Sequence, residues 1–169
     1  MEIRLLNGNQ GETFWELRLE GLRDHPEAFG SSYQQTLARP VQERLDQFRQ
    51  NVAGPDNCII GAWNNGKLVG VAGLRREEGP KERHKAGIWG VYVTPSARGL
   101  GVGKTLLEAV IQQAHTISDL EQLSLGVATN NLAARNLYLA LGFQIYGTEP
   151  HALKVGDKNI DEDLMVYFL

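Results

Sequence analysis

The sequence predicts a single α/β domain over residues 1–169, built on a mixed sheet of about seven strands with helices on both faces. Strand-like and helix-like segments alternate along the whole chain, and the 169 residues suit one domain at roughly 150 residues per domain. Asn65-Gly66 separates two apolar runs, which is typical of a tight antiparallel hairpin. Helical segments stand between the later strands and favour crossover connections, so parallel and antiparallel pairs should share one sheet.

The N-terminal third predicts a short strand over residues 2–6 and two helices. Thr13 and Glu16 have the spacing of a capping box near the start of a helix over residues 12–24. A second helix is expected to begin at Pro40, because the fixed φ of proline suits a first helical position. Residues 25–32 between the two helices read as a loop. The apolar positions that support the helices are Trp15, Leu19 and Leu22 for the first, and Val41, Leu45, Phe48 and Val52 for the second.

The remaining elements follow from apolar runs and from the residues that interrupt them. Gly54-Pro55 ends the second helix, and Gly142 stands where a helix commonly ends in a left-handed residue. Gly79-Pro80 lies in a charged stretch and predicts an exposed turn. The predicted strands are 58–63, 67–76, 86–94, 122–128, 143–155 and 159–169, and the predicted helices are 101–117 and 132–141.

Composition excludes several classes of protein. The 17 basic and 20 acidic residues give a formal charge of −3, which is unlike the basic surface of a nucleic-acid binder. The single Cys58 excludes an intrachain disulfide and a cysteine-based zinc site, and its apolar strand favours a buried thiol. We predict no metal, because His25, His84, His115 and His151 lack the spacing of metal ligands.

The location expected from the sequence is the cytoplasm. The first residues lack the basic-then-apolar order of a signal peptide. The longest apolar stretch, residues 68–74, is interrupted by glycines and falls far short of the ~20 residues of a membrane span. We therefore expect a soluble protein that has neither nucleic acid nor a membrane as a partner.

The most informative segment is residues 91–105, where a strand leads through a glycine-rich turn into a helix. This geometry aims several backbone N–H groups and the positive end of the helix at one spot, which favours binding of an anion such as a phosphate. Glycines let the ligand approach the backbone closely, and Arg98 and Lys104 add cationic donors. The competing interpretation is a turn without a ligand.

Two nucleotide-binding motifs fit this turn poorly. The Walker A loop requires glycine where Arg98 stands, and the dinucleotide fingerprint requires glycine where Lys104 stands. The turn also follows several antiparallel strands rather than the first strand of the chain. A P-loop nucleotide binder therefore stays a minor alternative.

Two motifs resemble the GNAT superfamily of N-acyltransferases. Arg98–Gly103 matches the pattern R/Q-x-x-G-x-G/A of the family's acetyl-CoA pyrophosphate loop, and Asn131–Phe143 matches N-x-x-A-x-x-L-Y-x-x-x-G-F. The predicted order of elements is similar to the GNAT fold over essentially the full chain. The resemblance implies that the parallel strands 86–94 and 122–128 splay apart.

The resemblance also implies an acetyl-CoA-dependent N-acetyltransferase, with acetyl-CoA as co-substrate and direct transfer to a primary amine in a ternary complex. By the same resemblance Tyr138 donates a proton to the departing thiolate, and Asn131 contacts the cofactor. The residues expected to bind acetyl-CoA are Val91, Tyr92, Val93, Arg98, Gly99, Leu100, Gly101, Val102, Gly103, Lys104, Asn131 and Tyr138.

Structural roles compete with the functional ones at these positions. Tyr138 could be a core aromatic residue, and Asn131 could be the N-cap of its helix. Many family members carry a carboxylate on the strand before the loop, but residues 86–93 contain neither Asp nor Glu. Glu27, His84 or a chain of water molecules could supply the base. A non-catalytic acyl-CoA-binding module is the alternative function.

The acceptor is expected to be an amine on a small molecule or a protein. Asp161, Glu162 and Asp163 could attract a cationic acceptor, or they could form the solvated start of a strand. With the net charge of −3, they favour a cationic over an anionic amine. A homodimer is possible by resemblance, and Trp15, Trp63 and Trp89 are expected in the core.

Overall fold

A computed structural model describes residues 1–169 and shows one seven-stranded sheet in the order β1-β2-β3-β4-β5-β7-β6. The strands are β1 Glu2–Leu5, β2 Asn57–Asn64, β3 Lys67–Arg76, β4 Lys85–Val93, β5 Gln122–Ala128, β6 Gln144–Val155 and β7 Lys158–Phe168. The helices are α1 Gly11–Asp24, α2 Tyr33–Ala38, α3 Val41–Asn51, α4 Val102–His115 and α5 Leu132–Ala140. The predicted mixed sheet of seven strands is confirmed.

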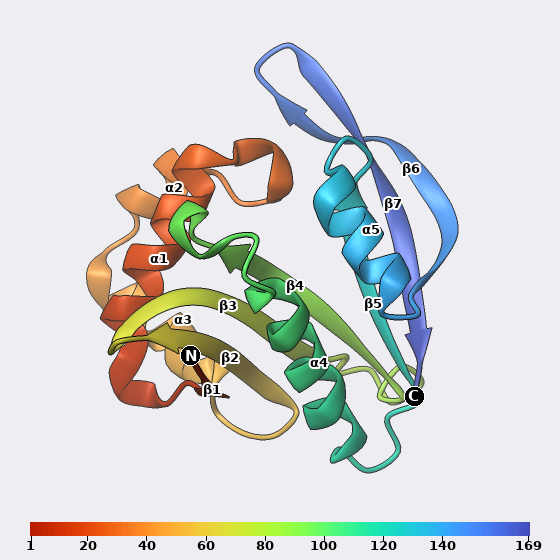
Figure 1. Ribbon diagram of the computed structural model, residues 1–169, viewed down its shortest axis with the longest axis horizontal. Coiled ribbons are helices and arrows are strands. Elements are labelled where there is room, and N and C mark those ends of the chain that lie inside the picture. Colours follow the sequence, from red (N-terminus) through yellow and green to blue (C-terminus); the bar gives the residue numbers. More distant parts are fainter.

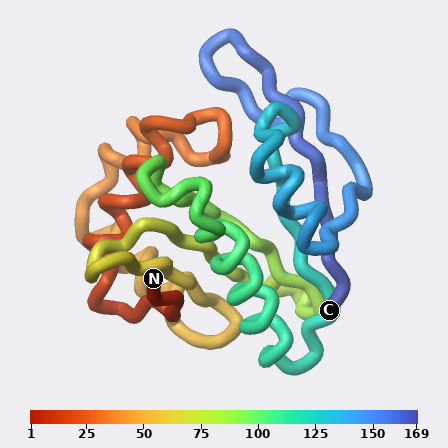
Figure 2. Tube along the Cα trace, viewed as in Figure 1, coloured from red at the N-terminus to blue at the C-terminus, as the bar shows by residue number.

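Helices cover both faces of the sheet, with a separate apolar cluster beneath each set (Figure 1). The larger cluster lies between the sheet and α4, around fully buried leucines such as Leu106 and Leu123. The smaller cluster joins α1 and α3 to the first strands through Phe14 and Phe48. Figure 2 shows the N-terminal helices and the β6–β7 hairpin on opposite sides of β4 and β5.

The only parallel pair in the sheet is β4 with β5, and it is short. The two strands pair from Lys85 with Gln122 to Gly87 with Ser124, and beyond that point they diverge. Gly90 has a φ of 65°, and the β3–β4 register shifts beside it, so β4 is bulged where the strands part. The splayed pair implied by the GNAT resemblance is therefore present.

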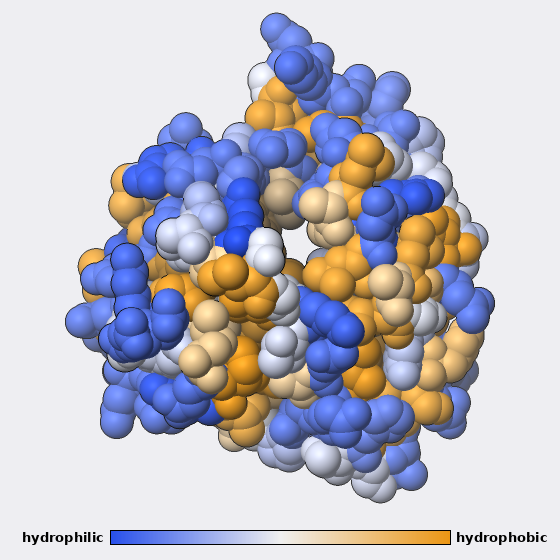
Figure 3. Space-filling model, viewed as in Figure 1, coloured by the Kyte–Doolittle hydropathy of each residue, from blue (hydrophilic) through white to orange (hydrophobic).

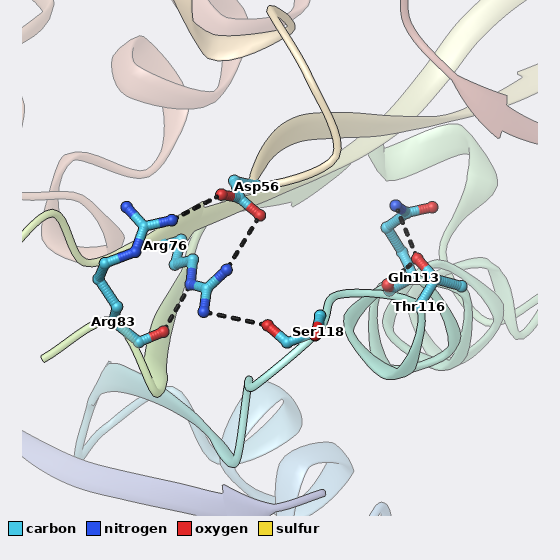
Figure 4. Close-up of polar contacts among 6 residues, drawn as sticks. All are labelled: Asp56, Arg76, Arg83, Gln113, Thr116 and Ser118. Atoms are coloured by element: carbon cyan, nitrogen blue, oxygen red, sulfur yellow. Dashed lines mark hydrogen bonds and ion pairs between the residues drawn. The ribbon is translucent and has the colours of Figure 1, made fainter.

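The opposite end of the parallel pair is held by polar contacts (Figure 4). Arg76 at the end of β3 lies 3.4 Å from Asp56 and donates to the carbonyl of Ser118 after α4, at 3.1 Å. Arg83, just before β4, pairs with the same Asp56 at 3.4 Å. Beside this network, Gln113 donates to Thr116 and helps to end α4. These links fix one end of the strands and leave the other free to diverge.

The N-terminal helices differ in detail from the expectation. Helix α1 begins at Gly11, so the predicted capping box of Thr13 and Glu16 is wrong; the capping box forms earlier, where the Asn7 N–H donates to Gln10. Pro40 is the N-cap of α3 and not its first helical residue. The stretch after α1 contains a 3₁₀ turn, Pro26–Ala28, and then the unpredicted α2. Six residues are too few for helical periodicity to show.

The prediction of a solvated strand start at Asp161–Asp163 is wrong, because the three residues lie inside β7. Asp163 is only 5% exposed; it accepts hydrogen bonds from Arg135 of α5 and Thr148 of β6, both at 2.7 Å. These bonds lower the pKa of Asp163, with the hydrogen bond from Arg135 as the largest cause. The Asp161 carboxylate accepts from the backbone N–H of His151 at 2.8 Å.

Asp163→Asn should lower the free energy of unfolding by about 1–3 kcal/mol at pH 7, since Arg135 loses its charged partner. A lowered pKa in the folded state contributes stability above the unfolded value of about 3.9 and loses it as the pH falls through the folded value. Urea unfolding at several pH values should therefore show the difference shrinking below about pH 4. An equal difference at pH 3 and pH 7 would contradict the ion pair.

Other predicted core residues are placed as follows. Trp15 and Trp63 are buried, whereas Trp89 on β4 is only half-buried. Cys58 is buried, and burial raises the pKa of its thiol to about 11, so this thiol is not a nucleophile at neutral pH. None of the helices has the length and apolar character needed to cross a lipid bilayer.

Candidate active site

A hollow opens between the two halves of the molecule where β4 and β5 diverge (Figure 3). Along this stretch β4 pairs only with β3, so its other backbone edge faces the hollow. Val91 and Val93 direct their side chains toward the α4 side, and Tyr92 is buried on the α1 side. A free strand edge can bind an extended chain through backbone hydrogen bonds, as the resemblance implies for a pantetheine arm.

The glycine-rich turn lies between β4 and α4. Gly99 and Gly101 have φ values of 75° and 77°, which L side chains rarely adopt, and Gly101 is the N-cap of α4. Apart from the glycine and its two chain neighbours, no residue has an atom within 4 Å of where a Cβ would stand at either position, so the turn has an open surface. The first N–H groups of an α-helix lack intrahelical partners. At α4 these belong to Val102, Gly103 and Lys104, so the predicted anion site has candidate donors here.

The two cationic side chains of the turn have partners within the chain. The Arg98 guanidinium donates to the carbonyl of Val93 at 3.0 Å and lies 2.8 Å from the His25 ring. Lys104 lies 3.6 Å from Glu108, one helical turn away, and both are exposed. Leu100, between the two glycines, is 69% exposed. The Arg98 side chain therefore faces the loop after α1, and the donors left for an anion at this turn are backbone N–H groups.

Helix α5 lies beside this turn and carries the second motif. Asn131 caps it by accepting from the N–H of Ala134 at 3.3 Å, so its predicted N-cap role is confirmed. A Cβ at Gly103 of α4 would lie 3.4 Å from Leu137 of α5, which shows how closely the two helices approach.

Tyr138 follows Leu137 and is 6% exposed, so its ring belongs to the larger apolar cluster. The ring packs edge-on against Phe143, with 5.8 Å between centroids. Burial raises the pKa of the Tyr138 hydroxyl to about 12. A phenol with this pKa stays protonated at neutral pH and can donate a proton.

The two residues considered as the general base, His84 and Glu27, lie at different distances from the diverging strands. His84 precedes β4 at the paired end of the strands, about 23 Å along the strand from Val91 at roughly 3.3 Å per residue, so it is not part of this site. Glu27 lies in the 3₁₀ turn that contacts β5 and β6, and its carboxylate is 3.7 Å from the His25 ring. The turn thus brings Glu27 toward the side of the sheet that carries β5.

Glu162 is a carboxylate whose position the sequence did not reveal. It stands opposite Ala128 across the β5–β7 pair, and one carboxylate oxygen lies 3.1 Å from where a Cβ would stand at Gly126. Burial and, second, the neighbouring charge of Glu149 raise its pKa. Only the strand register brings Glu162 beside the diverging end of β5, and no local spacing in the sequence could have shown this.

The sequence is similar to that of known acetyltransferases. The model of the acetyltransferase (GNAT) family matches residues 19–143, well over half of the chain. The N-alpha-acetyltransferase RimI of Mycobacterium tuberculosis is 34% identical over 100 residues, covering 59% of this chain and 60% of that protein. The chain thus matches less than two thirds of that relative's length.

Solved structures share the whole fold. A GNAT-family acetyltransferase from Streptococcus pneumoniae superimposes with a TM-score of 0.87 at 22% identity, covering 99% of each chain. A Salmonella typhimurium protein solved with its cofactor acetyl-CoA gives a TM-score of 0.86 at 20% identity, covering 100% of this chain and 94% of that one. At such identities the likeness concerns the fold.

Proposed function

This chain belongs to the acetyltransferase (GNAT) family, and we propose that it transfers an acetyl group from acetyl-CoA directly to a primary amine in a ternary complex. The observation that carries the proposal is the free edge of β4, which leads straight into the glycine-rich turn at the start of α4. A thioester arm along the edge and a pyrophosphate on the turn would occupy both features at once. The motif residues of α5 lie beside the same turn.

In this proposal the backbone does most of the cofactor binding. The edge of Val91–Val93 holds the pantetheine arm, and an N–H at Tyr92 or Val93 polarises the thioester carbonyl. The pyrophosphate lies on the N–H groups of residues 98–104. Asn131 contacts the cofactor from the α5 N-terminus while it caps that helix. These roles are supported by the open surface at Gly99 and Gly101, which leaves room for a ligand at the backbone.

Acetyl-CoA supplies an acetyl group activated as a thioester, and the chain must handle two protons. The attacking amine has to lose a proton, and the departing thiolate has to gain one. We assign the donor role to the neutral hydroxyl of Tyr138. We assign the acceptor role to Glu162, because a carboxylate with a raised pKa is a stronger base than an ordinary one and lies beside the diverging strand.

An amine panel that follows release of free CoA tests the activity, with calorimetry of acetyl-CoA binding alongside. Binding together with turnover of at least one amine supports the proposal. Binding without turnover across peptides, amino acids, polyamines and aminoglycosides would favour the non-catalytic acyl-CoA-binding module. Absence of acetyl-CoA binding would reject the proposed function itself.

Glu162→Gln should lower kcat/KM by about 10- to 100-fold at neutral pH, since general base catalysis is worth at least this much. In the wild type, activity should fall as the pH drops through the raised pKa of Glu162, and the variant should lack this acid limb. The matched control is Glu149→Gln, which removes the neighbouring charge and should move the acid limb to lower pH. Full activity of Glu162→Gln with an unchanged acid limb would assign the base elsewhere.

A further inference from the structure

A second cavity, of about 340 Å³, lies on the α1 side of the sheet between the N-terminal helices and the strands β3 and β4. Its charged lining is strongly unbalanced, because three arginines face it against one glutamate. Arg39 and Arg75 are exposed at its edge, whereas Arg18 of α1 is only 8% exposed. The charged residues that line the cavity are Arg18, Arg39, Arg75 and Glu77.

Arg18 is a buried cation without a counter-ion. One terminal nitrogen of its guanidinium, Nη1, is fully buried and has no hydrogen-bond partner in the chain. The group lies 4.4 Å above the ring of Phe29, and burial lowers its pKa to about 10, so it stays charged at neutral pH. A buried charge that lacks a partner is strongly unfavourable. Its presence in a cavity therefore points to an anion that arrives from outside.

The buried arginine of the cavity lies beside the bulge of β4, next to the strand edge proposed for acetyl transfer. Nη1 of Arg18 lies 3.5 Å from where a Cβ would stand at Gly90, the bulged residue directly before Val91. Trp89, the preceding residue, also lines the cavity, and its buried indole N–H has no acceptor. Two unsatisfied donors thus face or adjoin one cavity, beside the strand edge that would hold the thioester.

Arg18 and Glu162 lie on the same face of the sheet, on the two strands' sides of the divergence. Glu162 pairs with Ala128 and shares its face of the sheet with Gly126. Leu125 belongs to the cluster under α4, so Glu162 lies on the other face, away from α4. Arg18 lies on that same face at the β4 side, because α1 packs there. An acceptor between them would meet a positive group on one side and a carboxylate on the other.

We infer that the acceptor is an amine that also carries an oxyanion, with an amino-acid carboxylate as the favoured case; this inference rests on the proposed function. The oxyanion binds Arg18 in the cavity, and the amine faces Glu162. This replaces the expectation of a simply cationic acceptor, which relied on Asp161–Asp163 and the net charge of −3. Asp163 is already paired with Arg135, and Asp161 accepts from the His151 backbone, so only Glu162 of the three is left to meet an amine.

Matched acceptor pairs test the inference. The panel contains α-amino acids, their α-carboxamides, aminoalkyl phosphonates and spermidine, and it follows CoA release. We expect kcat/KM at least 10-fold higher for the free acids than for the carboxamides, because buried donors reject an analogue that leaves them unpaired. A higher rate with the phosphonates would identify a different oxyanion at the same site. Equal rates with acids and carboxamides, or a preference for spermidine, would overturn the inference.

Variants then assign the preference to Arg18. Arg18→Gln should raise KM for the free acids by about 10- to 100-fold and leave KM for the carboxamides within about 3-fold, because it removes a charge-assisted pair. The control is Arg23→Gln on the same helix, an exposed arginine paired with Asp24. Arg18→Lys, which keeps the charge without the two-donor fork, serves if the glutamine protein does not fold. An unchanged acid preference in both Arg18 variants would overturn the assignment.

A binding readout keeps the test decisive if no panel member turns over. With CoA bound, millimolar amino acid should shift the indole N–H resonance of Trp89, assigned with Trp89→Phe, and the carboxamide should not. The shift should vanish in Arg18→Gln. Absence of any shift in the wild type would reject the anion site. Absence of both acetyl-CoA binding and turnover would instead reject the proposed function, so the two failures are distinguishable.

Discussion

Gly101→Val is expected to lower the affinity for acetyl-CoA by 10-fold or more, as measured by calorimetry, while the chain stays folded. Gly101 has a φ of 77° and an open surface at the N-terminus of α4. A β-branched side chain there would stand where the pyrophosphate is proposed to lie. The left-handed conformation would also cost about 1–2 kcal/mol for valine. The turn would relieve this strain by shifting its N–H groups away from the proposed pyrophosphate position.

The matched control is Gly66→Val in the β2–β3 hairpin. Gly66 also has a φ of 77° and no atom within 4 Å of a Cβ position, so the substitution imposes the same strain far from the turn. We expect both variants to lose a similar amount of thermal stability and only Gly101→Val to lose affinity. Unchanged affinity in Gly101→Val would place the phosphate site elsewhere.

Tyr138→Phe should lower kcat by about 10- to 1,000-fold, since it removes the proton donor and keeps the ring that packs against Phe143. The Kd for acetyl-CoA should hardly change, because the hydroxyl acts mainly on the departing thiolate. An equal loss in kcat and kcat/KM would mark a contact made only in the transition state. Stopped-flow detection of free thiol measures the loss directly.

Tyr167→Phe is the matched control, because Tyr167 packs against the same Phe143 with 5.3 Å between centroids. Each variant loses one hydroxyl from the same aromatic cluster, so a packing effect should appear in both. Loss of kcat in Tyr138→Phe alone supports the donor role. Full activity of Tyr138→Phe would remove it, and a stable variant with weak binding would make Tyr138 a cofactor contact.

Features that depend on neighbouring residues could be predicted from the sequence. The glycine-rich turn, the cap at Asn131 and the end of α5 at Gly142 each follow from backbone preferences within a few positions. Helical periodicity and apolar runs also predicted the longer helices and the seven strands, with bounds that differ from the structure by a few residues. Prediction failed where local signals were weak. The capping box forms at Asn7 instead of Thr13, and α2 is too short to show helical periodicity.

Tertiary structure decided which distant side chains share a face of the sheet. The proposed cofactor loop could be recognised in the sequence because its residues belong to one continuous segment, 98–104. Arg18 and Glu162 come from opposite ends of the chain, and they lie on the same face of the sheet because α1 packs on β4 and β7 pairs with β5. The bulge at Gly90 and the divergence of β4 from β5 set this arrangement. Such positions follow from strand register and helix packing, which act over long sequence separations and leave no local pattern.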